Sequence, residues 1–425
     1  MTISSARGLI RNLADFIAEL KRRRVFRGKT METKTAIDRR AFIKTTAAGA
    51  AGLALLGKVG GQAPDARPLK WLPREQFVYR TLGKTGIRLP VVSMGVEHAD
   101  NPALIRAAMD AGVVYFDTAY TYQQGKNEEL LGQLARERPG DAVIISTKVL
   151  GGKKTSYENF LWRFNRSLQR LGMEYVDILY LHGAMSRDHA LREPILRALR
   201  KLKEEGKARF VGVSAHTRVP DVIHAAVDSQ FYDVVMAAYT FKQRDHKKVE
   251  EAINRAGEAG LGVITMKVFS GVFLNRENTE MVDSKAALKW VLRNPNVHSV
   301  MVGMYTFDQL AMNLSVMEDL TLTEEEKGRL EEQGAEVGLY CQGCEQCLPQ
   351  CPPGLPIPDL MRAYMYVYGY HQLRSAYDLV TSLKLPDAVC RDCESCPVAC
   401  AHGFNVAERI KDVLRLREVP LDFIA

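Results

Sequence analysis

Eight apolar, β-branched runs follow one another between residues 79 and 313, and segments with helical patterning separate them. Each run starts 22 to 35 residues after the previous one, which leaves room for one helix per gap. Continuous apolar strands alternating with helices are typical of a parallel sheet that is buried on both faces. Eight such units favour a (β/α)8 TIM barrel, an α/β fold, over a doubly wound sheet. The predicted strands are Val91–Val96, Val113–Asp117, Ala142–Lys148, Val176–His182, Ala208–Ser214, Asp233–Tyr239, Gly262–Val268 and Val297–Gly303.

The chain divides into four parts around this barrel, and its 425 residues are enough for two or three domains. The barrel is expected to occupy residues 79–338. A helix over 323–338 should close it, beginning with a capping box between Thr323 and Glu326. An N-terminal extension (1–57) and a linker with prolines and glycines (58–78) precede the barrel. A C-terminal domain (339–425) follows it and holds all eight cysteines.

The net charge of +8 comes from the first 44 residues, which carry 12 Lys/Arg against 4 Asp/Glu. The remaining residues sum to zero, so the body of the protein has no basic excess and we expect no nucleic-acid partner. No apolar stretch approaches the roughly 20 residues that a membrane helix needs.

The N-terminal extension carries two targeting features. Residues 9–24 combine an apolar helix face with a basic end, so they are either a helix that lies on a membrane surface or a stretch upstream of a true start at Met31. Further on, Arg39 and Arg40 precede a short Gly/Ala-rich apolar segment, which resembles a twin-arginine export signal. The resemblance implies a periplasmic or otherwise exported protein that uses the twin-arginine translocation machinery. A short buried helix is the alternative.

Four chemically active side chains stand at or just after the ends of predicted strands two, three and four: Asp117, Tyr122, Lys148 and His182. Active sites of such barrels lie where the strands end, so these side chains are expected to meet. A single aspartate could cap a helix and a single histidine could belong to the core. Four together predict a catalytic site.

Residues 79–313 resemble the aldo-keto reductase family in several motifs, namely Phe-Asp117-Thr-Ala-x-x-Tyr122, Glu128/Glu129-x-Leu-Gly132, Ser-Thr-Lys148, Leu171-Gly172, Tyr-Val-Asp177 before His182, and Gly206-Lys207-Ala-Arg209 leading to Ser214. The resemblance implies hydride transfer between a nicotinamide and a small carbonyl or alcohol, with the four side chains as a tetrad. Tyr122 would protonate the carbonyl oxygen, and Lys148 would stabilise the resulting phenolate. Asp117 would orient Lys148, and His182 would position the carbonyl.

The same resemblance implies contacts to the cofactor. It places Ser214 by the carboxamide, and Asn313 by the adenine in the segment that starts at Gly303. No Lys or Arg lies between Gly303 and Asn313, where relatives often hold a 2′-phosphate. A phosphate without a cation binds weakly, so we expect NAD rather than NADP. Lys267 is a cation, so NADP stays as the alternative. Gln123 follows Tyr122 where the family usually has Gly.

The cysteines form two equally spaced groups, Cys341-x-x-Cys344-x-x-Cys347-x-x-x-Cys351 and Cys390-x-x-Cys393-x-x-Cys396-x-x-x-Cys400. This spacing resembles that of two-cluster bacterial ferredoxins and implies a mainly helical ferredoxin-like iron–sulfur domain with two [4Fe–4S] clusters. One cluster would bind Cys341, Cys344, Cys347 and Cys400, and the other Cys390, Cys393, Cys396 and Cys351. Zinc and disulfides are alternatives that the spacing disfavours. A tyrosine-rich helical stretch from Leu360 to Leu383 is expected to pack over the clusters.

Together these features predict an exported oxidoreductase that interconverts a carbonyl and an alcohol and is coupled or docked to iron–sulfur electron transfer, with a redox partner protein. The alternative is an electron-transfer module whose barrel is a non-catalytic docking scaffold. The loops between the predicted elements show no charge pattern that identifies the substrate.

Replacing Arg39 and Arg40 together by lysine should leave the protein in the cytoplasm with its cofactors, because the export signal depends on the arginine pair. Cell fractionation followed by immunoblotting measures this. Lysine in place of Arg22 and Arg23 is a matched control that should still be exported. Wild-type amounts of the Arg39/Arg40 variant in the periplasm would contradict the interpretation.

Overall fold

The computed structural model describes residues 74–424 apart from 98, 139–141, 153, 244, 270, 272–273, 275–279, 336–339, 342, 371, 387–388, 391–394 and 421–423. The N-terminal extension, the arginine pair and most of the linker lie outside the described residues. So does Cys393.

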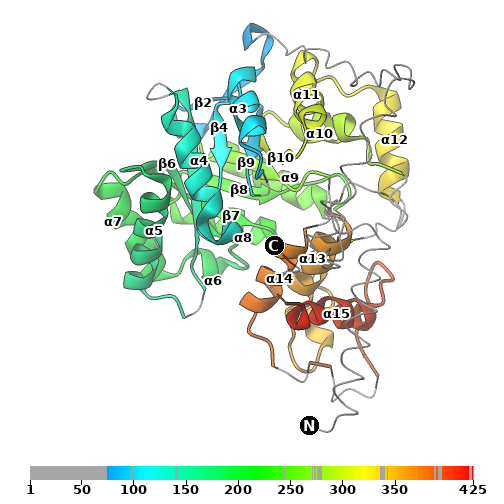
Figure 1. The fold of residues 1–425 in the computed structure, drawn as a ribbon. Helices are drawn as coiled ribbons and strands as arrows, with labels where there is room; N and C mark the ends of the chain where they lie inside the picture. Colours follow the sequence, from blue (N-terminus) through cyan, green and yellow to red (C-terminus); the bar gives the residue numbers. More distant parts are fainter. Residues whose placement is uncertain are drawn as a thin grey trace, which may run out of the picture.

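Eight parallel strands form a closed barrel in the order β10-β3-β4-β5-β6-β7-β8-β9 (Figure 1). All eight predicted strands are confirmed, with ends that differ by a few residues: β3 (Val92–Gly95), β4 (Tyr115–Asp117), β5 (Ile144–Leu150), β6 (Val176–His182), β7 (Ala208–Ala215), β8 (Val234–Ala238), β9 (Gly262–Met266) and β10 (Ser299–Gly303). Around them lie the helices α3 (Pro102–Ala111), α4 (Lys126–Arg136), α5 (Tyr157–Leu171), α6 (Arg187–Ala190), α7 (Glu193–Glu204), α8 (Val219–Ser229), α9 (His246–Glu258), α10 (Ser284–Leu292) and α11 (Phe307–Ser315). The main core lies between these helices and the outer face of the strands.

A short antiparallel hairpin precedes the barrel, and the strand pattern did not predict it. It consists of β1 (Tyr79–Thr81) and β2 (Arg88–Pro90). Leu82 and Leu89 are fully buried and belong to the cluster that fills the barrel, together with Tyr115 and Tyr180. The backbone N–H of Lys84 donates to the carbonyl oxygen of Gly260, next to the start of β9. The hairpin therefore closes the end of the barrel that is opposite the strand carboxyl ends.

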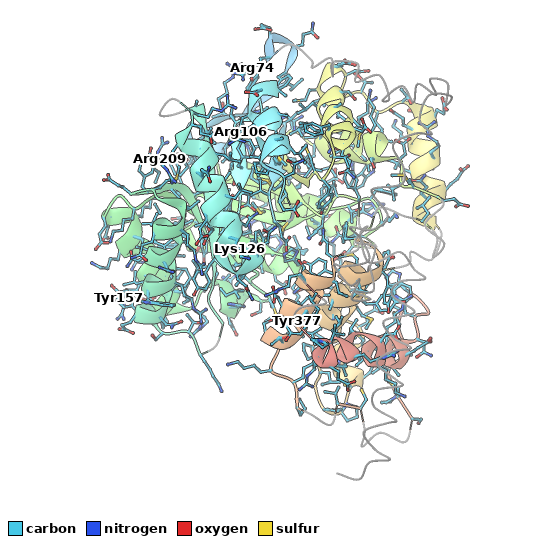
Figure 2. The ribbon with its side chains drawn as sticks, viewed as in Figure 1. Arg74, Arg106, Lys126, Tyr157, Arg209 and Tyr377 are labelled. Carbon is cyan, nitrogen blue, oxygen red and sulfur yellow. The ribbon has the colours of Figure 1, made fainter. Side chains whose placement is uncertain are left out.

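Two motif carboxylates hold strands and helices together. Glu128 on α4 is fully buried, and it accepts from the Thr147 hydroxyl at 2.7 Å and from the Arg170 guanidinium at 3.2 Å. Asp177 on β6 accepts from the Ile145 backbone N–H at 2.9 Å and from Arg209, labelled in Figure 2, at 2.7 Å. These residues order the scaffold on which the site is built.

Gly132 explains one family motif by close approach. A Cβ at this position of α4 would lie 2.0 Å from the carbonyl oxygen of Leu171 at the end of α5. Only glycine lets the two helices come this close.

The predicted closing helix is α12 (Glu324–Ala335). The Thr323 hydroxyl accepts from the Glu326 backbone N–H at 3.1 Å, and the Glu326 carboxylate accepts from the Thr323 N–H at 2.9 Å. The capping box is therefore confirmed.

The C-terminal part has its own hydrophobic core, and all the regular elements described in it are helical. Its helices are α13 (Ile357–Tyr368), α14 (Leu373–Ser382) and α15 (Val406–Leu414), with 3-10 turns at Leu348–Gln350 and Arg415–Glu418. The predicted helical stretch from Leu360 to Leu383 is thus two helices, interrupted after Tyr368. They group beside the barrel in Figure 1. In the part of the chain that the structure describes, no helix is both long and apolar enough for a membrane span.

Candidate active site

The four tetrad residues meet at the carboxyl ends of the barrel strands. Asp117 ends β4, Lys148 lies on β5, and His182 ends β6. Tyr122 begins the 3-10 turn Tyr122–Gly125, which follows β4. The Lys148 ammonium lies 4.6 Å from the ring centroid of Tyr122, and the rings of Tyr122 and His182 meet edge to face at 5.9 Å.

A buried ion pair forms the base of this arrangement. The Lys148 ammonium donates to the Asp117 carboxylate and, at 2.6 Å, to the carbonyl oxygen of Thr118. The second oxygen of Asp117 accepts from the Ser146 hydroxyl at 2.6 Å. Burial raises the pKa of Asp117, and the Lys148 ammonium and the Ser146 hydroxyl oppose that rise. Because both charges are almost inaccessible to water, each must keep its partner.

Tyr122 is held as a proton-bearing phenol. Burial raises its pKa well above the usual value, and the carboxylates of Glu97 and Asp117 add to the rise. The Lys148 ammonium, which is bound to Asp117, lies over the ring. The proton of Tyr122 is therefore retained at neutral pH.

The backbone after Tyr122 is strained. Gln123 and Gln124 have φ values of 47° and 58°, in the left-handed region where glycine is favoured. The Gln123 side chain donates to the carbonyl oxygen of Glu97 at 3.0 Å, which helps to hold the turn. Strained residues of this kind cluster at functional sites.

His182 is neutral at physiological pH. Burial lowers its pKa to about 3, and the Lys148 ammonium contributes in the same direction. Its Nδ1 is buried without a hydrogen-bond partner among the described residues. A neutral imidazole can orient a carbonyl through one ring nitrogen.

The four residues predicted for cofactor contact lie in different surroundings. Asn313 on α11 is 1% exposed, and its Oδ1 has no hydrogen-bond partner in the described structure, so an amine donor such as that of adenine fits it. The Ser214 hydroxyl already accepts from the Gly183 N–H at 2.9 Å. Gly303 is exposed at the end of β10, whereas Lys267, just after β9, faces the C-terminal domain.

Residues 92–286 match the Aldo/keto reductase family. The chain contains an aldo/keto reductase family domain. Among curated proteins it is similar to the L-glyceraldehyde 3-phosphate reductase of Escherichia coli O157:H7, at 28% identity over 326 residues that cover 61% of this chain and 93% of the relative. It is also similar to the pyridoxal 4-dehydrogenase of Microbacterium luteolum, at 24% identity over 55% of this chain and 91% of the relative.

A solved structure shares the fold of this domain: an aldo-keto reductase from Bacillus halodurans in its holo form, with a TM-score of 0.51 and 24% identity over 63% of this chain and 99% of that one. The family match, the relatives named as a reductase and a dehydrogenase, and the assembled tetrad agree. The protein is an NAD(P)-dependent oxidoreductase.

The C-terminal domain covers the mouth of the aldo/keto reductase domain. The Gly271 N–H donates to the Tyr370 hydroxyl at 3.0 Å, the Gln372 amide donates to the Tyr305 hydroxyl at 2.5 Å, and the Ser375 hydroxyl donates to the Glu97 carboxylate at 3.4 Å. Each barrel partner follows a strand at its carboxyl end. The sequence patterns identified none of these contacts.

Only part of the tyrosine-rich stretch packs within the C-terminal domain. Tyr364 contacts Tyr368 at 4.5 Å and the Arg409 guanidinium at 4.7 Å. Tyr366 and Tyr370 instead lie against Lys267 of the barrel, at 4.8 and 5.4 Å from its ammonium. These two rings therefore have a partner in the barrel that the sequence did not predict.

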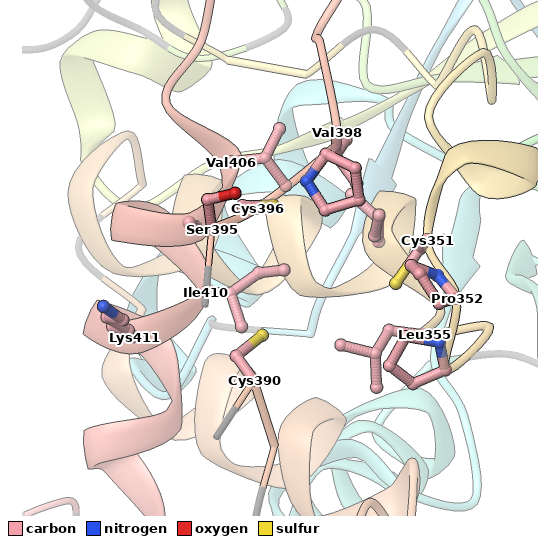
Figure 3. Close-up of a pocket in the computed structure, with 14 residues that line it drawn as sticks. Cys351, Pro352, Leu355, Cys390, Ser395, Cys396, Val398, Val406, Ile410 and Lys411 are labelled. Carbon is pink, nitrogen blue, oxygen red and sulfur yellow. The ribbon is translucent and has the colours of Figure 1, made fainter. Parts of the chain in front are cut away.

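Seven of the eight cysteines are described; none of the seven forms a disulfide, and they lie in two groups. Burial raises the pKa of Cys341 to about 12, and the neighbouring thiols of Cys344, Cys347 and Cys400 add to the rise. The remaining three, Cys351, Cys390 and Cys396, line one cavity of about 90 Å³ with Leu355 and Ile410 (Figure 3). Among the described residues, no three of these side chains already stand at metal-binding spacing.

Replacing Tyr122 by phenylalanine should reduce the rate of carbonyl reduction about 10²- to 10⁴-fold, because it removes the proton donor. Steady-state kinetics with NADH and a small aldehyde measures the loss, and circular dichroism checks that the barrel is folded. Tyr120→Phe, which leaves the tetrad complete, is the matched control. Near wild-type reduction by the Tyr122 variant would place the chemistry elsewhere.

The pH–rate profile should lack a step near pH 6.5. A free histidine gains its proton there on acidification, but the lowered pKa of His182 delays protonation to about pH 3. The neutral imidazole is thus present throughout pH 5–8, and kcat/KM should stay flat on the acid side of that range. A decline near pH 6.5 that disappears in His182→Gln would show that His182 titrates normally.

Proposed function

We propose that this protein is an exported oxidoreductase of small carbonyl compounds, in which hydride chemistry in the barrel is joined to iron–sulfur electron transfer in the C-terminal domain. The observation that carries the proposal is the position of the tetrad beneath a domain whose cysteines gather in two groups.

The barrel residues divide the work of carbonyl reduction. A bound nicotinamide would supply the hydride. Tyr122 holds the proton that the carbonyl oxygen needs, and neutral His182 can orient that oxygen toward the phenol. The Lys148 ammonium lies next to the ring of Tyr122, so it favours the phenolate as the proton leaves. Asp117 keeps Lys148 in place.

NAD remains the preferred cofactor in this proposal. The unpartnered Oδ1 of buried Asn313 fits an adenine amine. The first turn of α11 carries an exposed carboxylate, Asp308, and a 2′-phosphate beside it would meet repulsion.

The substrate proposed is a small carbonyl or alcohol. The two curated relatives are named for reactions of glyceraldehyde 3-phosphate and of pyridoxal, and both are small carbonyl compounds. The covered mouth also favours a compact substrate, since Tyr370 and Ser375 of the C-terminal domain contact residues that follow the barrel strands.

Two [4Fe–4S] clusters are proposed on the cysteine groups that the spacing defined. One group comprises Cys341, Cys344, Cys347 and Cys400, and backbone N–H groups donate to two of its sulfurs, at 3.3 Å to Cys341 and 3.4 Å to Cys400. The other would add Cys393, outside the described residues, to Cys351, Cys390 and Cys396. Clusters bound there would supply one-electron transfer. Four clustered thiols ionise together only where a metal balances their charge.

The proposed export and the proposed clusters support each other. Clusters are assembled in the cytoplasm, and the twin-arginine route carries proteins that have already folded. An exported enzyme without a free nicotinamide pool needs another source of electrons, so we propose a redox partner protein that docks at the C-terminal domain.

Anaerobically purified protein should contain about eight iron atoms and eight sulfides per chain. Replacing Cys344 or Cys396 by serine should each remove about half of the iron, because the two residues belong to different groups. Elemental analysis and the visible spectrum measure this, and Ser395→Ala, beside Cys396, is the control that should retain all of it. Stoichiometric zinc, or disulfides without iron, would contradict the cluster assignment.

One observation favours the scaffold alternative: the C-terminal domain already occupies the entrance to the tetrad through Tyr370, Gln372 and Ser375. A fluorescence titration with NADH separates the two functions. Saturable binding supports the enzyme, and its absence in cluster-containing protein supports a barrel that only docks.

A further inference from the structure

Lys267 occupies an unusual place at the catalytic end of the barrel. It follows the last residue of β9, Met266, and its φ of 57° lies in the left-handed region, which is uncommon for a residue with a long side chain. Its ammonium lies over the rings of Tyr366 and Tyr370, both supplied by the C-terminal domain. A barrel residue in a strained conformation thus meets two aromatic rings from the other half of the chain.

The surroundings of Lys267 are those of the tetrad. Burial is the main cause that lowers the pKa of both His182 and His216, and the charges of Arg362 and Lys267 contribute to both shifts, so the two cations and the two imidazoles lie near one another. Burial works against the charge of Lys267, but its neighbours, among them Tyr366 and Glu97, raise its pKa overall. Lys267 is therefore cationic at neutral pH.

The other cations of this region are already neutralised. Arg362 pairs with Asp359 at 2.6 Å, and Lys148 pairs with Asp117. The contacts described for Lys267 are to aromatic faces, which attract a cation without cancelling its charge. An ammonium that is held by aromatic faces can still donate its N–H groups to a ligand.

We propose that Lys267 binds a phosphate or other anionic group of the ligand that reacts at the tetrad, and that Tyr366 and Tyr370 are positioning residues that hold its ammonium there. The C-terminal domain thereby completes the binding site of the barrel. The inference rests on the proposed function for the identity of the reaction, but not for the anion site itself.

Inorganic pyrophosphate is the probe, and calorimetry on the anaerobically purified full-length protein measures its binding without turnover. Wild type should bind pyrophosphate, and Lys267→Met should bind it about 10- to 100-fold more weakly because a charge-assisted hydrogen bond is lost. Lys267→Arg should restore most of the affinity.

The positioning role is tested on the rings. Tyr366→Leu should weaken pyrophosphate binding severalfold, whereas Tyr366→Phe, which keeps the ring face, should not. Tyr368→Leu is the matched control: Tyr368 lies on the same helix and is equally buried, 7% exposed, but it contacts Tyr364 and the Asp412 carboxylate. It should leave binding unchanged.

Two further measurements identify the source of the anion. If it belongs to the substrate, Lys267→Met raises KM for glyceraldehyde 3-phosphate about tenfold or more but not KM for glyceraldehyde. If it belongs to the cofactor, the same variant weakens NADH binding and affects both aldehydes equally. Either result supports the proposal.

The proposal is overturned if wild type does not bind pyrophosphate, if Lys267→Met binds it as tightly as wild type, or if Tyr366→Leu has no more effect than Tyr368→Leu. A Lys267 that only balances the Glu97 carboxylate gives the second result. A protein that binds pyrophosphate through Lys267 but reduces no aldehyde contradicts the proposed function and leaves the anion site established.

Discussion

The ion pair between Lys148 and Asp117 is the interaction on which the geometry of the site depends. Its charges are 2% and 3% exposed, and the large desolvation penalty is offset only while the two remain paired. The pair ties the end of β4 to β5, and the Thr118 carbonyl and the Ser146 hydroxyl complete its hydrogen bonds. Because the ammonium cannot leave this position, the ring of Tyr122 beside it has a fixed neighbour.

Burial then sets the protonation states around this pair. It raises the pKa of Tyr122 and lowers that of His182, so that both side chains are uncharged over the physiological range. A neutral phenol with a neutral imidazole suits the donation of a proton to a carbonyl better than the removal of one from an alcohol. The helices that cover the mouth contribute to this burial, so the C-terminal domain influences the chemistry without supplying a tetrad residue.

The sequence predicts those features that follow from a repeated pattern. The barrel strands are continuous apolar runs such as Val176–His182, and burial on both faces leaves them no other composition. The hairpin was not predicted, because Tyr79–Thr81 is only three residues long and is too short to show an alternating hydrophobic pattern. The contact between Tyr370 and Gly271 was not predicted for a different reason. Contacts between distant segments depend on the shape of both surfaces, and local residue spacing does not encode that shape. The two cysteine groups lie between these cases, since their spacing indicated which thiols should gather but not where they lie.

The covering helices α13 and α14 follow the whole barrel in the sequence, and α15 comes after them. The segments that carry Tyr122 and His182 are therefore synthesised before the helices that cover them. The cover is complete only when the C-terminal domain has folded and contacts Gly271, Tyr305 and Glu97. The order of elements along the chain thus means that the site is made before its cover.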